Sequence, residues 1–414
     1  MRISFMAYDR PAYTGGPIIN ARRILPELVK RGHQVQALLG YHQDYPNARF
    51  LEKQGVECRV IEFTNTEIMV KWILEQLQDF QPDVFVPNIS VAGGFAAKWA
   101  KQANIATIIA HRSNDEFNWG LARMFGFGFK EWQTSGLVCV SNYLKKEVLK
   151  KTRIPVEIEV IPSGIPIPEK TADQNTQHPF SVIYAGRMEQ IIKRIWDIIE
   201  SFIAVIRKYD DVQFTLLGEG GEKQKLIEYI ARNNLTSRIL FKDRLTGDAY
   251  HEELLRHHAI VLLSDFEGMP GSLMDGMACG LVPVGSNVVG INELVQHNHT
   301  GILLDKRNED FVKSIGKLKT DKILRSKLSV NARQHIINNY SLDITVDRWE
   351  AFFERLVSAN CQQIKISRTI KLPPVLPELA REDHRVNKSK LKSVRMYAVH
   401  AKNFMKTVFK KRPI

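Results

Sequence analysis

The segment from Ser264 to Gly280 combines residue types that suit a ligand with both hydroxyl and phosphate groups. It follows the apolar run Ile260–Leu263 and has the pattern of a strand end, a loop and a helix. The first N–H groups of a helix, and the partial positive charge there, favour a phosphate. Glu267 in the loop and Asp275 in the first helical turn can accept hydrogen bonds from hydroxyls. The segment therefore predicts a binding site for a phosphorylated sugar derivative.

The helix in this segment is expected to begin at Gly271 and Ser272, with the Ser272 side chain as its cap. Taken alone, the two carboxylates have a plainer explanation. Asp275 would complement the helix dipole, and Glu267 would be a charged residue of a surface loop.

A second group of residues favours the ligand site over this plainer explanation. The run Ser181–Ala185 ends in Gly186 and Arg187, and Lys193 follows six residues later. Arginine can bind phosphate oxygens through two parallel hydrogen bonds, and lysine adds a second positive charge. These residues are expected to offset the charge of a diphosphate without a metal ion.

The first half of the chain has two weaker candidates at predicted strand ends. Gly15 and Gly16 lie between the first predicted strand and a helix, where glycine lets the backbone approach a phosphate or a sugar. His111 ends the run Ile105–Ala110 and can bind a hydroxyl or carry a proton. An ordinary turn and a packed histidine explain these residues equally well.

Alternating strand and helix patterns position all of these residues. The polar stretch Lys170–Pro179 separates two such series and is expected to link two doubly wound α/β domains. Ligands of such folds bind beyond the carboxyl ends of the strands, so the cleft between the domains is the expected site. The predicted strands are Ile3–Tyr8, Gln34–Leu39, Cys58–Phe63, Asp83–Pro87, Ile105–Ala110, Leu137–Val140, Ile158–Ile161, Ser181–Ala185, Gln213–Leu217, Ile239–Lys242, Ile260–Leu263, Val282–Val284 and Gly301–Leu304.

Composition excludes several other classes of protein. The 414 residues are 44% apolar and 25% charged, which is ordinary for a globular protein. The four cysteines are far apart and form no zinc or disulfide pattern, which favours a reducing compartment. The N-terminus does not resemble a signal peptide, and no run of 18 apolar residues predicts a membrane span.

The net charge of +13 belongs mostly to the end of the chain. Residues 365–414 carry 14 Lys and Arg against three acidic residues, a surplus of 11 that leaves +2 for the other 364 residues. Apolar residues recur at three- and four-residue spacing between Leu391 and Val408, with lysines and arginines largely off that stripe. Residues 388–412 are therefore expected to form a basic amphipathic helix. It would bind an anionic membrane surface, pack on the enzyme itself or stay solvated.

Together these residues resemble the family 4 retaining glycosyltransferases, over about residues 1–360. The segment from Glu267 to Gly280 is the most specific part, because the family has two Glu residues where this chain has Glu267 and Asp275. The resemblance implies the GT-B fold, α/β with two Rossmann-like domains facing a cleft. The implied divisions are 1–169 on the acceptor side, a linker at 170–179, a nucleotide-sugar domain at 180–341, a crossing helix at 342–360 and the basic tail at 361–414.

The resemblance also implies roles for the candidate residues. Glu267 would contact the donor sugar and Asp275 the ribose, while Arg187 and Lys193 would hold the diphosphate; Arg194 replaces the glycine that usually follows that lysine. His111 would face the donor sugar. The other implied donor contacts are Gly15, Gly16, Leu245, Gly271 and the backbone amides of Ser272 and Leu273. Acceptor contacts are expected in the loops Asn88–Gly94 and Arg112–Gly120.

The implied reaction moves a hexose or related sugar from a nucleoside diphosphate to an acceptor hydroxyl with retention, without a cofactor or catalytic metal. The acceptor would be a glycan, a lipid-linked sugar or a small molecule. The enzyme would act in the cytoplasm or at the inner face of the membrane, in the synthesis of a polysaccharide, glycolipid or cell-surface glycan.

Two other classes remain open at this point. Some nucleotide-sugar epimerases and phosphorylases share the two-domain architecture and differ in needing no acceptor or in needing phosphate. Nucleic-acid binding through the basic tail is the alternative that involves no enzyme. The charge of only +2 on the first 364 residues argues against a specific nucleic-acid surface.

Overall fold

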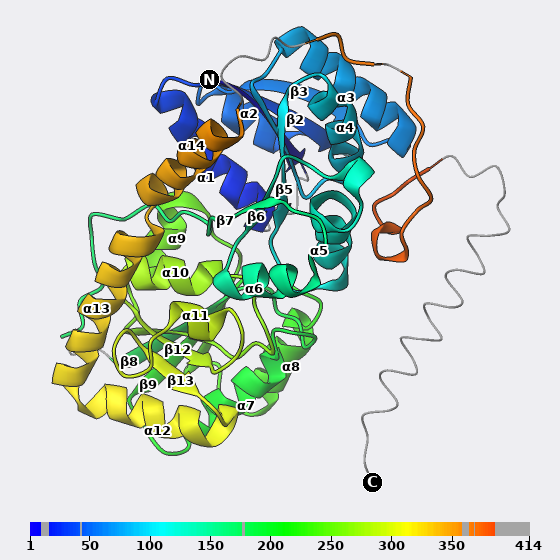
Figure 1. The fold of residues 1–414 in the computed structure, drawn as a ribbon. Helices are drawn as coiled ribbons and strands as arrows, with labels where there is room; N and C mark the ends of the chain where they lie inside the picture. Colours follow the sequence, from blue (N-terminus) through cyan, green and yellow to red (C-terminus); the bar gives the residue numbers. More distant parts are fainter. Residues whose placement is uncertain (10–15, 42–43, 176–178, 358–363, 368, 386–414) are drawn as a thin grey trace, which may run out of the picture.

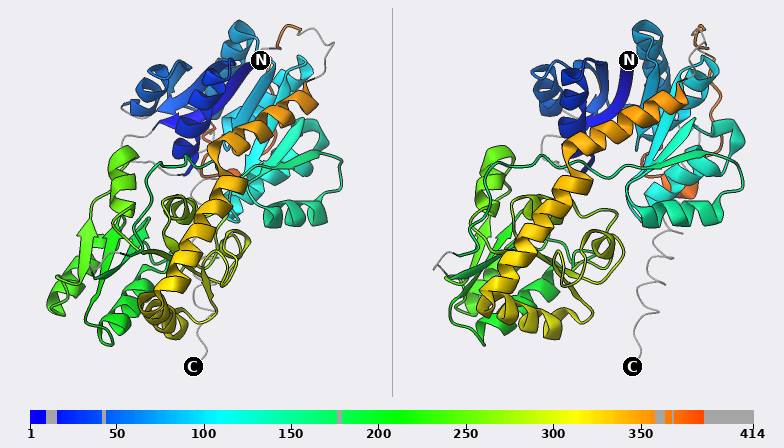
Figure 2. Two further views of the ribbon diagram at one scale, coloured as in Figure 1. Left: turned by 90° about the vertical axis from the view of Figure 1, so that its left-hand side faces the viewer. Right: turned by 60° about the vertical axis from the view of Figure 1, so that its left-hand side comes forward.

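The computed structural model describes residues 1–9, 16–41, 44–175, 179–357, 364–367 and 369–385. They form two α/β domains, with helices α13 and α14 running along one side of both (Figure 1). The side views show α14 leaving the second domain and lying against the first (Figure 2).

The first domain is built on a parallel sheet which, in the described part of the chain, has seven strands in the order β3-β2-β1-β4-β5-β6-β7. The strands are β1 (Arg2–Asp9), β2 (Gln34–Tyr41), β3 (Glu57–Glu62), β4 (Val84–Asn88), β5 (Ala106–His111), β6 (Gly136–Cys139) and β7 (Glu157–Val160). Its helices are α1 (Gly16–Lys30), α2 (Pro46–Glu52), α3 (Thr66–Phe80), α4 (Val91–Gln102), α5 (Glu116–Leu121), the π-helix η1 (Ala122–Phe127), the 3-10 helix η2 (Lys130–Trp132) and α6 (Asn142–Lys151).

The second domain repeats this plan with a parallel sheet in the order β10-β9-β8-β11-β12-β13. Its strands are β8 (Phe180–Ala185), β9 (Val212–Leu217), β10 (Ile239–Lys242), β11 (Ala259–Leu262), β12 (Val282–Ser286) and β13 (Ile302–Leu304). Its helices are α7 (Ile195–Ile206), α8 (Lys223–Arg232), α9 (Gly247–Leu254), α10 (Gly271–Ala278), α11 (Ile291–Leu294), α12 (Arg307–Thr320) and α13 (Lys322–Tyr340). Each of the thirteen predicted strands has a counterpart, with ends that differ by no more than two residues.

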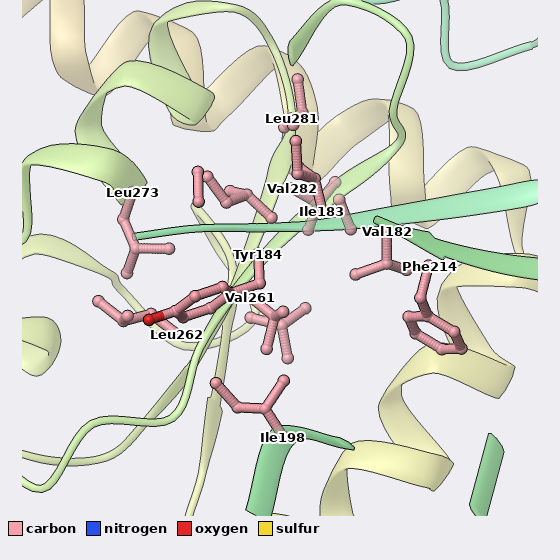
Figure 3. Packing of buried hydrophobic residues seen from close by; sticks show 14 of the residues in the cluster. Val182, Ile183, Tyr184, Ile198, Phe214, Val261, Leu262, Leu273, Leu281 and Val282 are labelled. Atoms are coloured by element: carbon pink, nitrogen blue, oxygen red, sulfur yellow. The ribbon is translucent and has the colours of Figure 1, made fainter. Parts of the chain in front are cut away.

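Buried apolar runs explain why both sheets are parallel and covered on both faces. All six residues of β8 and all four of β11 are buried, as expected for strands between two helical layers. Figure 3 shows Val182, Tyr184 and Val261 of these strands packing with Ile198 of α7 and Leu273 of α10. The loops that follow β8 and β11 are thereby attached to a rigid core.

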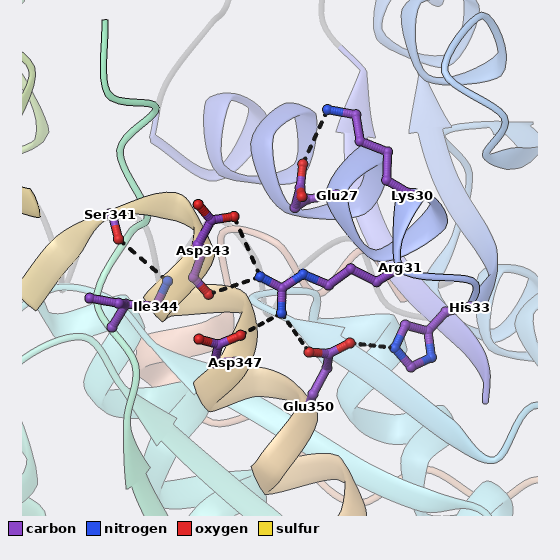
Figure 4. A network of polar contacts seen from close by, with 9 residues as sticks. All are labelled: Glu27, Lys30, Arg31, His33, Ser341, Asp343, Ile344, Asp347 and Glu350. Atoms are coloured by element: carbon purple, nitrogen blue, oxygen red, sulfur yellow. Dashed lines mark hydrogen bonds and ion pairs between the residues drawn. The ribbon is translucent and has the colours of Figure 1, made fainter.

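Helix α14 (Leu342–Leu356) belongs to the core of the first domain although it follows the second in sequence. Its Trp349, Phe352 and Phe353 are at most 1% exposed and join the cluster under β1. At its N-terminal end, Arg31 of the first domain binds three residues of α14 (Figure 4): its Nη1 lies 2.5 Å from Asp347 and 2.7 Å from Glu350, and its Nη2 lies 3.5 Å from Asp343. Apolar packing and ion pairs therefore attach this helix to the first domain.

Part of the predicted tail, residues 364–367 and 369–385, lies against the first domain instead of extending away from it. Ile366 is 4% and Leu379 1% exposed, and both belong to the first domain's core beside α4 and α5. The short 3-10 helix η3 (Pro377–Leu379) packs on α5 (Figure 1). We call residues 369–385 the C-terminal strap. The predicted basic helix at 388–412 falls outside the described residues.

Candidate functional site

The predicted site lies where the order of the second sheet reverses, between β8 and β11. The two strands are hydrogen-bonded neighbours, although 73 residues of the chain, 186 to 258, lie between them. The loop after β8 carries Arg187 and Lys193, and the loop after β11 carries Glu267. Such a reversal opens a crevice at the carboxyl ends of the strands, which is the usual ligand position in open α/β sheets.

Lys193 and Glu267 form an ion pair in this crevice. The Lys193 Nζ lies 2.6 Å from the Glu267 Oε1, and the side chains are 16% and 13% exposed. The Ser264 hydroxyl donates to the same oxygen at 2.6 Å. The Glu267 Oε2 has no donor in the described part of the chain, so it can accept a hydrogen bond from a ligand.

The backbone around Lys193 has an uncommon conformation. Ile192 has φ of +70° and Arg194 has φ of +55°, in the left-handed region that non-glycine residues rarely adopt. The Ile192 carbonyl accepts a bond from the Asp265 N–H (2.9 Å), and the Arg194 Nε binds Asp197 (2.7 Å). Arg194 thus adopts the conformation that a glycine would adopt more easily, and contacts on both sides hold the Lys193 loop in place.

Two glycines make room for the backbone of the Glu267 loop, because a side chain at either position would clash with a neighbouring carbonyl group. A Cβ on Gly290, which has φ of +84°, would lie 2.3 Å from the Glu267 carbonyl oxygen. A Cβ on Gly268 would lie 2.2 Å from the carbonyl oxygen of Arg112 in the first domain. The loop therefore touches both domains, and larger residues at these positions would push it out of the crevice.

Helix α10 points its N-terminus at the same crevice. Its first intrahelical bond runs from Met274 N to Pro270 O, so the N–H groups of Gly271, Ser272 and Leu273 are not used by the helix. The prediction that Ser272 caps the helix is wrong. Pro270 holds the cap position without a side-chain hydrogen bond, and Ser272 is already the second helical residue.

Asp275 has a partner that the sequence did not suggest. Its Oδ1 lies 2.8 Å from Nη2 of Arg23 on α1, and the two side chains are 9% and 15% exposed. Arg23 also donates to the Gly164 carbonyl at 3.3 Å. The carboxylate that we expected at the ribose thus links the two domains in this structure. The only sequence signal was the position of Arg23 on the helix that follows the Gly15-Gly16 turn.

Both charges are largely buried, and Arg23→Ala leaves the Asp275 carboxylate without its cation. This change should therefore lower the free energy of unfolding by about 3 kcal/mol. Arg23→Ala combined with Asp275→Ala should cost less than the two single changes added together. Urea unfolding of the four proteins measures this coupling. Lys170→Ala, which removes an exposed ion pair with Glu252, is the control and should change little. Additive effects of the two single changes would contradict the pairing.

Arg187 lies at the edge of the crevice and is not bound to the Lys193–Glu267 pair. Its side chain is 57% exposed and contacts Glu189 at 3.1 Å. The loop that carries it is packed on Gly218 and Gly220, where a Cβ would lie 2.0 Å from Gly186 O and 2.3 Å from Met188 O. These glycines thus support the Arg187 loop.

His111 is completely buried at the end of β5. Its ring contacts Trp119 with centroids 4.5 Å apart, and neither ring nitrogen has a hydrogen-bond partner among the described residues. Burial lowers the pKa of His111 to about 4, so the imidazole is neutral at pH 7.

The remaining predicted donor residues are less closely grouped. Leu245 is half-buried against the core of the second domain, and Leu273 is fully buried there. Gly16 is exposed at the start of α1. Gly15 lies outside the described residues.

A pocket of about 360 Å³ opens in the cleft, on the first domain's side. The ends of β1 and β4, where the first sheet reverses, contribute Tyr8 and Ile89. Met269 of the second domain also lines it, as does Glu382 of the C-terminal strap. The other lining residues are Gly16, Pro17, Ile18, Arg112, Ser113, Asp115, Phe117, Asn118, Val140 and Ser163. Several belong to the loop Arg112–Gly120, but the contribution of the strap had no signal in the sequence.

Two protein-family models match consecutive regions of the chain. Residues 14–168 match "Glycosyltransferase Family 4", and residues 168–335 match "Glycosyl transferases group 1". The N-acetyl-alpha-D-glucosaminyl L-malate synthase of Bacillus anthracis is 26% identical over 364 residues, which cover 82% of this chain and 93% of that protein. An Escherichia coli UDP-Gal:alpha-D-GlcNAc-diphosphoundecaprenol alpha-1,3-galactosyltransferase is 27% identical over 233 residues, 52% of this chain and 59% of that protein.

Solved structures support the fold. The Anabaena protein Alr3699/HepE, solved with UDP and glucose, superposes with a TM-score of 0.69 at 17% identity, covering 86% of this chain and all of that one. The sucrose-phosphate synthase of Thermosynechococcus elongatus gives a TM-score of 0.69 at 16% identity, with 87% of this chain and all of that one covered. With this two-domain fold and both halves matched, the chain belongs to the family 4 glycosyltransferases and is an enzyme that transfers a sugar.

Proposed function

We propose that this enzyme takes its sugar from a nucleoside diphosphate, with UDP as the favoured nucleotide. The Lys193–Glu267 pair beside the N-terminus of α10 carries this proposal. The ammonium and the free helical N–H groups suit a diphosphate, and the spare oxygen of Glu267 suits a sugar hydroxyl. The Anabaena protein was solved with UDP-glucose, and the name of the Escherichia coli relative specifies UDP-Gal, which supports UDP over other nucleotides.

The proposed reaction keeps the anomeric configuration. The bond between C1 of the sugar and the diphosphate oxygen breaks, and a bond from C1 to the acceptor oxygen forms on the same face. The acceptor proton passes to the leaving diphosphate. Lys193, Arg187 and the helix start stabilise the charge that develops on the leaving group, so positioning and electrostatics supply most of the catalysis. These cations perform the role of a metal ion, and no cofactor takes part.

A donor panel tests this proposal. UDP-, GDP- and ADP-sugars are incubated with the enzyme, with and without EDTA, and thermal shift and slow hydrolysis are measured. We expect one UDP-sugar to stabilise the protein and to be hydrolysed equally well in EDTA, releasing the sugar with its original anomeric configuration by NMR. If no nucleotide sugar binds, the proposal is wrong. An epimerase would instead convert the donor to a second nucleotide sugar.

We also propose that the enzyme works at the inner face of the membrane, in the synthesis of a polysaccharide, glycolipid or cell-surface glycan. The basic amphipathic pattern of residues 388–412 supports membrane contact, since each basic residue near an anionic surface contributes about 1 kcal/mol. In the described part of the chain, no helix has the length and apolar character to cross a bilayer.

Liposome flotation checks the membrane contact. Full-length enzyme should float with phosphatidylglycerol vesicles and stay behind with phosphatidylcholine vesicles. The matched control ends at Arg385, which removes the basic segment and keeps the strap that packs on the first domain. Equal flotation of the two proteins would contradict membrane contact through residues 388–412.

A further inference from the structure

The C-terminal strap is attached to the first domain at two places on either side of Glu382. On one side, η3 packs on α5 so closely that a Cβ on Gly120 would lie 2.6 Å from the Glu378 Cβ. The carboxylate of Glu378 also pairs with Arg123 at 2.7 Å. Leu379 is 1% exposed beneath this contact. This end of the strap is therefore fixed by apolar packing as well as by charge.

On the other side of Glu382, the strap is bound to the first turn of α3. The Thr66 N–H donates to the His384 carbonyl (2.9 Å), and the Thr66 hydroxyl donates to Asp383 Oδ1 (2.8 Å). Between the two attachments the chain makes a tight turn, with the N–H groups of Glu382 and Asp383 both donating to Leu379 O. Glu382 is thus held on a fixed backbone where it lines the cleft pocket.

The Glu382 carboxylate is available to a ligand, unlike the other charged groups of the pocket. It makes no hydrogen bond or ion pair among the described residues. Both oxygens of Asp115 accept bonds from Asn118 at 2.9 to 3.1 Å. The Arg112 Nε donates to the Asn88 Oδ1 at 2.8 Å. With the oxygen of the Asn20 amide facing Arg112, this oxygen accepts hydrogen bonds from Nη2 and Nη1 at 2.9 and 3.3 Å.

The pocket walls suit a neutral sugar unit. Tyr8 and Phe117 supply aromatic rings, and Ile18, Ile89 and Met269 supply apolar surface. A sugar ring has apolar C–H faces and hydroxyl edges, so it can use both these walls and a free carboxylate. A negatively charged acceptor group would instead be repelled by Glu382.

We propose that the C-terminal strap forms one wall of the acceptor site, and that Glu382 accepts a hydrogen bond from a hydroxyl of a neutral sugar acceptor. Glu382 is a positioning and specificity residue, because the proton released in the reaction goes to the diphosphate. This inference rests on the proposed transfer from a nucleotide sugar. It adds a residue from outside the two matched regions to the site.

The test uses full-length enzyme and the donor found by its hydrolysis. Octyl α- and β-glucosides, galactosides and N-acetylglucosaminides serve as neutral acceptor probes, and the corresponding sugar 1-phosphates as charged ones. The wild type should prefer a neutral probe. Glu382→Ala and Glu382→Gln should raise the KM for that probe by about 10-fold or more, because a charge-assisted hydrogen bond is lost. Both changes should reduce the discrimination against sugar phosphates, and neither should alter kcat greatly.

Two controls separate the possible failures. Hydrolysis of the donor without acceptor should be the same in the wild type and both Glu382 variants. Arg381→Ala changes an exposed neighbour on the strap and should leave the acceptor KM unchanged. If no donor is hydrolysed, the proposed function itself fails. If hydrolysis proceeds but no neutral probe is glycosylated, or if the Glu382 variants behave like Arg381→Ala, the assignment of Glu382 is wrong.

Discussion

Lys193→Ala should lower kcat by about 100- to 1,000-fold, while the KM for the donor changes much less. The Lys193 ammonium lies within 2.6 Å of the Glu267 carboxylate, in a crevice that is largely closed to water. A positive charge in such a place stabilises the departing diphosphate more than the intact donor, because charge accumulates on the leaving group as the bond breaks. Steady-state kinetics with the sugar donor that the panel selects measures the effect.

Two comparisons distinguish this effect from simple damage to the fold. Lys170→Ala removes a surface lysine of the same size and should retain full activity. Lys193→Arg keeps the charge and should recover part of the rate. Thermal unfolding of Lys193→Ala should stay within a few degrees of the wild type, since the carboxylate keeps its bond from Ser264. Near-normal turnover of Lys193→Ala would contradict the assignment of Lys193 to stabilising the leaving diphosphate.

Acid should destabilise the first domain through buried His111 and the second domain through buried His258. Burial lowers the pKa of His111 in the first domain and of His258 in the second to about 4, from 6.5 in an unfolded chain. Nearby Arg325 contributes to lowering the pKa of His258. Below pH 6.5 the unfolded chain takes up protons that the folded protein does not, so stability falls as the pH drops from 6.5 to 4. Each histidine should cost about 2 kcal/mol at pH 5 relative to pH 7.5.

Urea unfolding at pH 7.5 and pH 5 measures this loss. In the fold, His258 Nδ1 accepts a bond from the Ser181 N–H at 3.1 Å, which requires that nitrogen to be unprotonated. His258→Asn keeps an acceptor at this position and removes the titration, so its second domain should lose about 2 kcal/mol less on acidification. His299→Asn, at an exposed histidine, should behave like the wild type. Equal acid sensitivity of His258→Asn and the wild type would contradict the buried neutral histidine.

Much of the fold was predictable because its signals are local. Apolar runs such as Ser181–Ala185 predict strands that are buried on both faces. The alternation of these runs with helical patterns predicts two doubly wound domains. The segment of the proposed donor site has equally local signals. Glu267 and the start of α10 follow a strand directly, and the chemistry of a strand end and a helix start depends on neighbouring residues.

Two local details, the cap of α10 and the backbone around Lys193, depend on how neighbouring residues compete for the same position or conformation. Ser272 is a favoured capping residue, but Pro270 takes the cap position, and Ser272 is already inside the helix, which begins at Gly271. Arg194 stands where the family usually has a glycine, and it adopts a left-handed conformation there. Its neighbour Ile192 adopts the same conformation without any sequence signal, because the strain is balanced by contacts with the loop after β11.

The sequence alone determined the two α/β domains and the family, and it indicated which residues form the proposed donor site. Only the tertiary structure decided which of them meet. Lys193 pairs with Glu267 across 74 positions, and Asp275 pairs with Arg23 across 252. Residues 369–385 show no periodicity, yet they bring Glu382 into the pocket. Contacts between such distant residues arise when whole elements pack, and packing depends on surfaces from many segments at once, which no local pattern records.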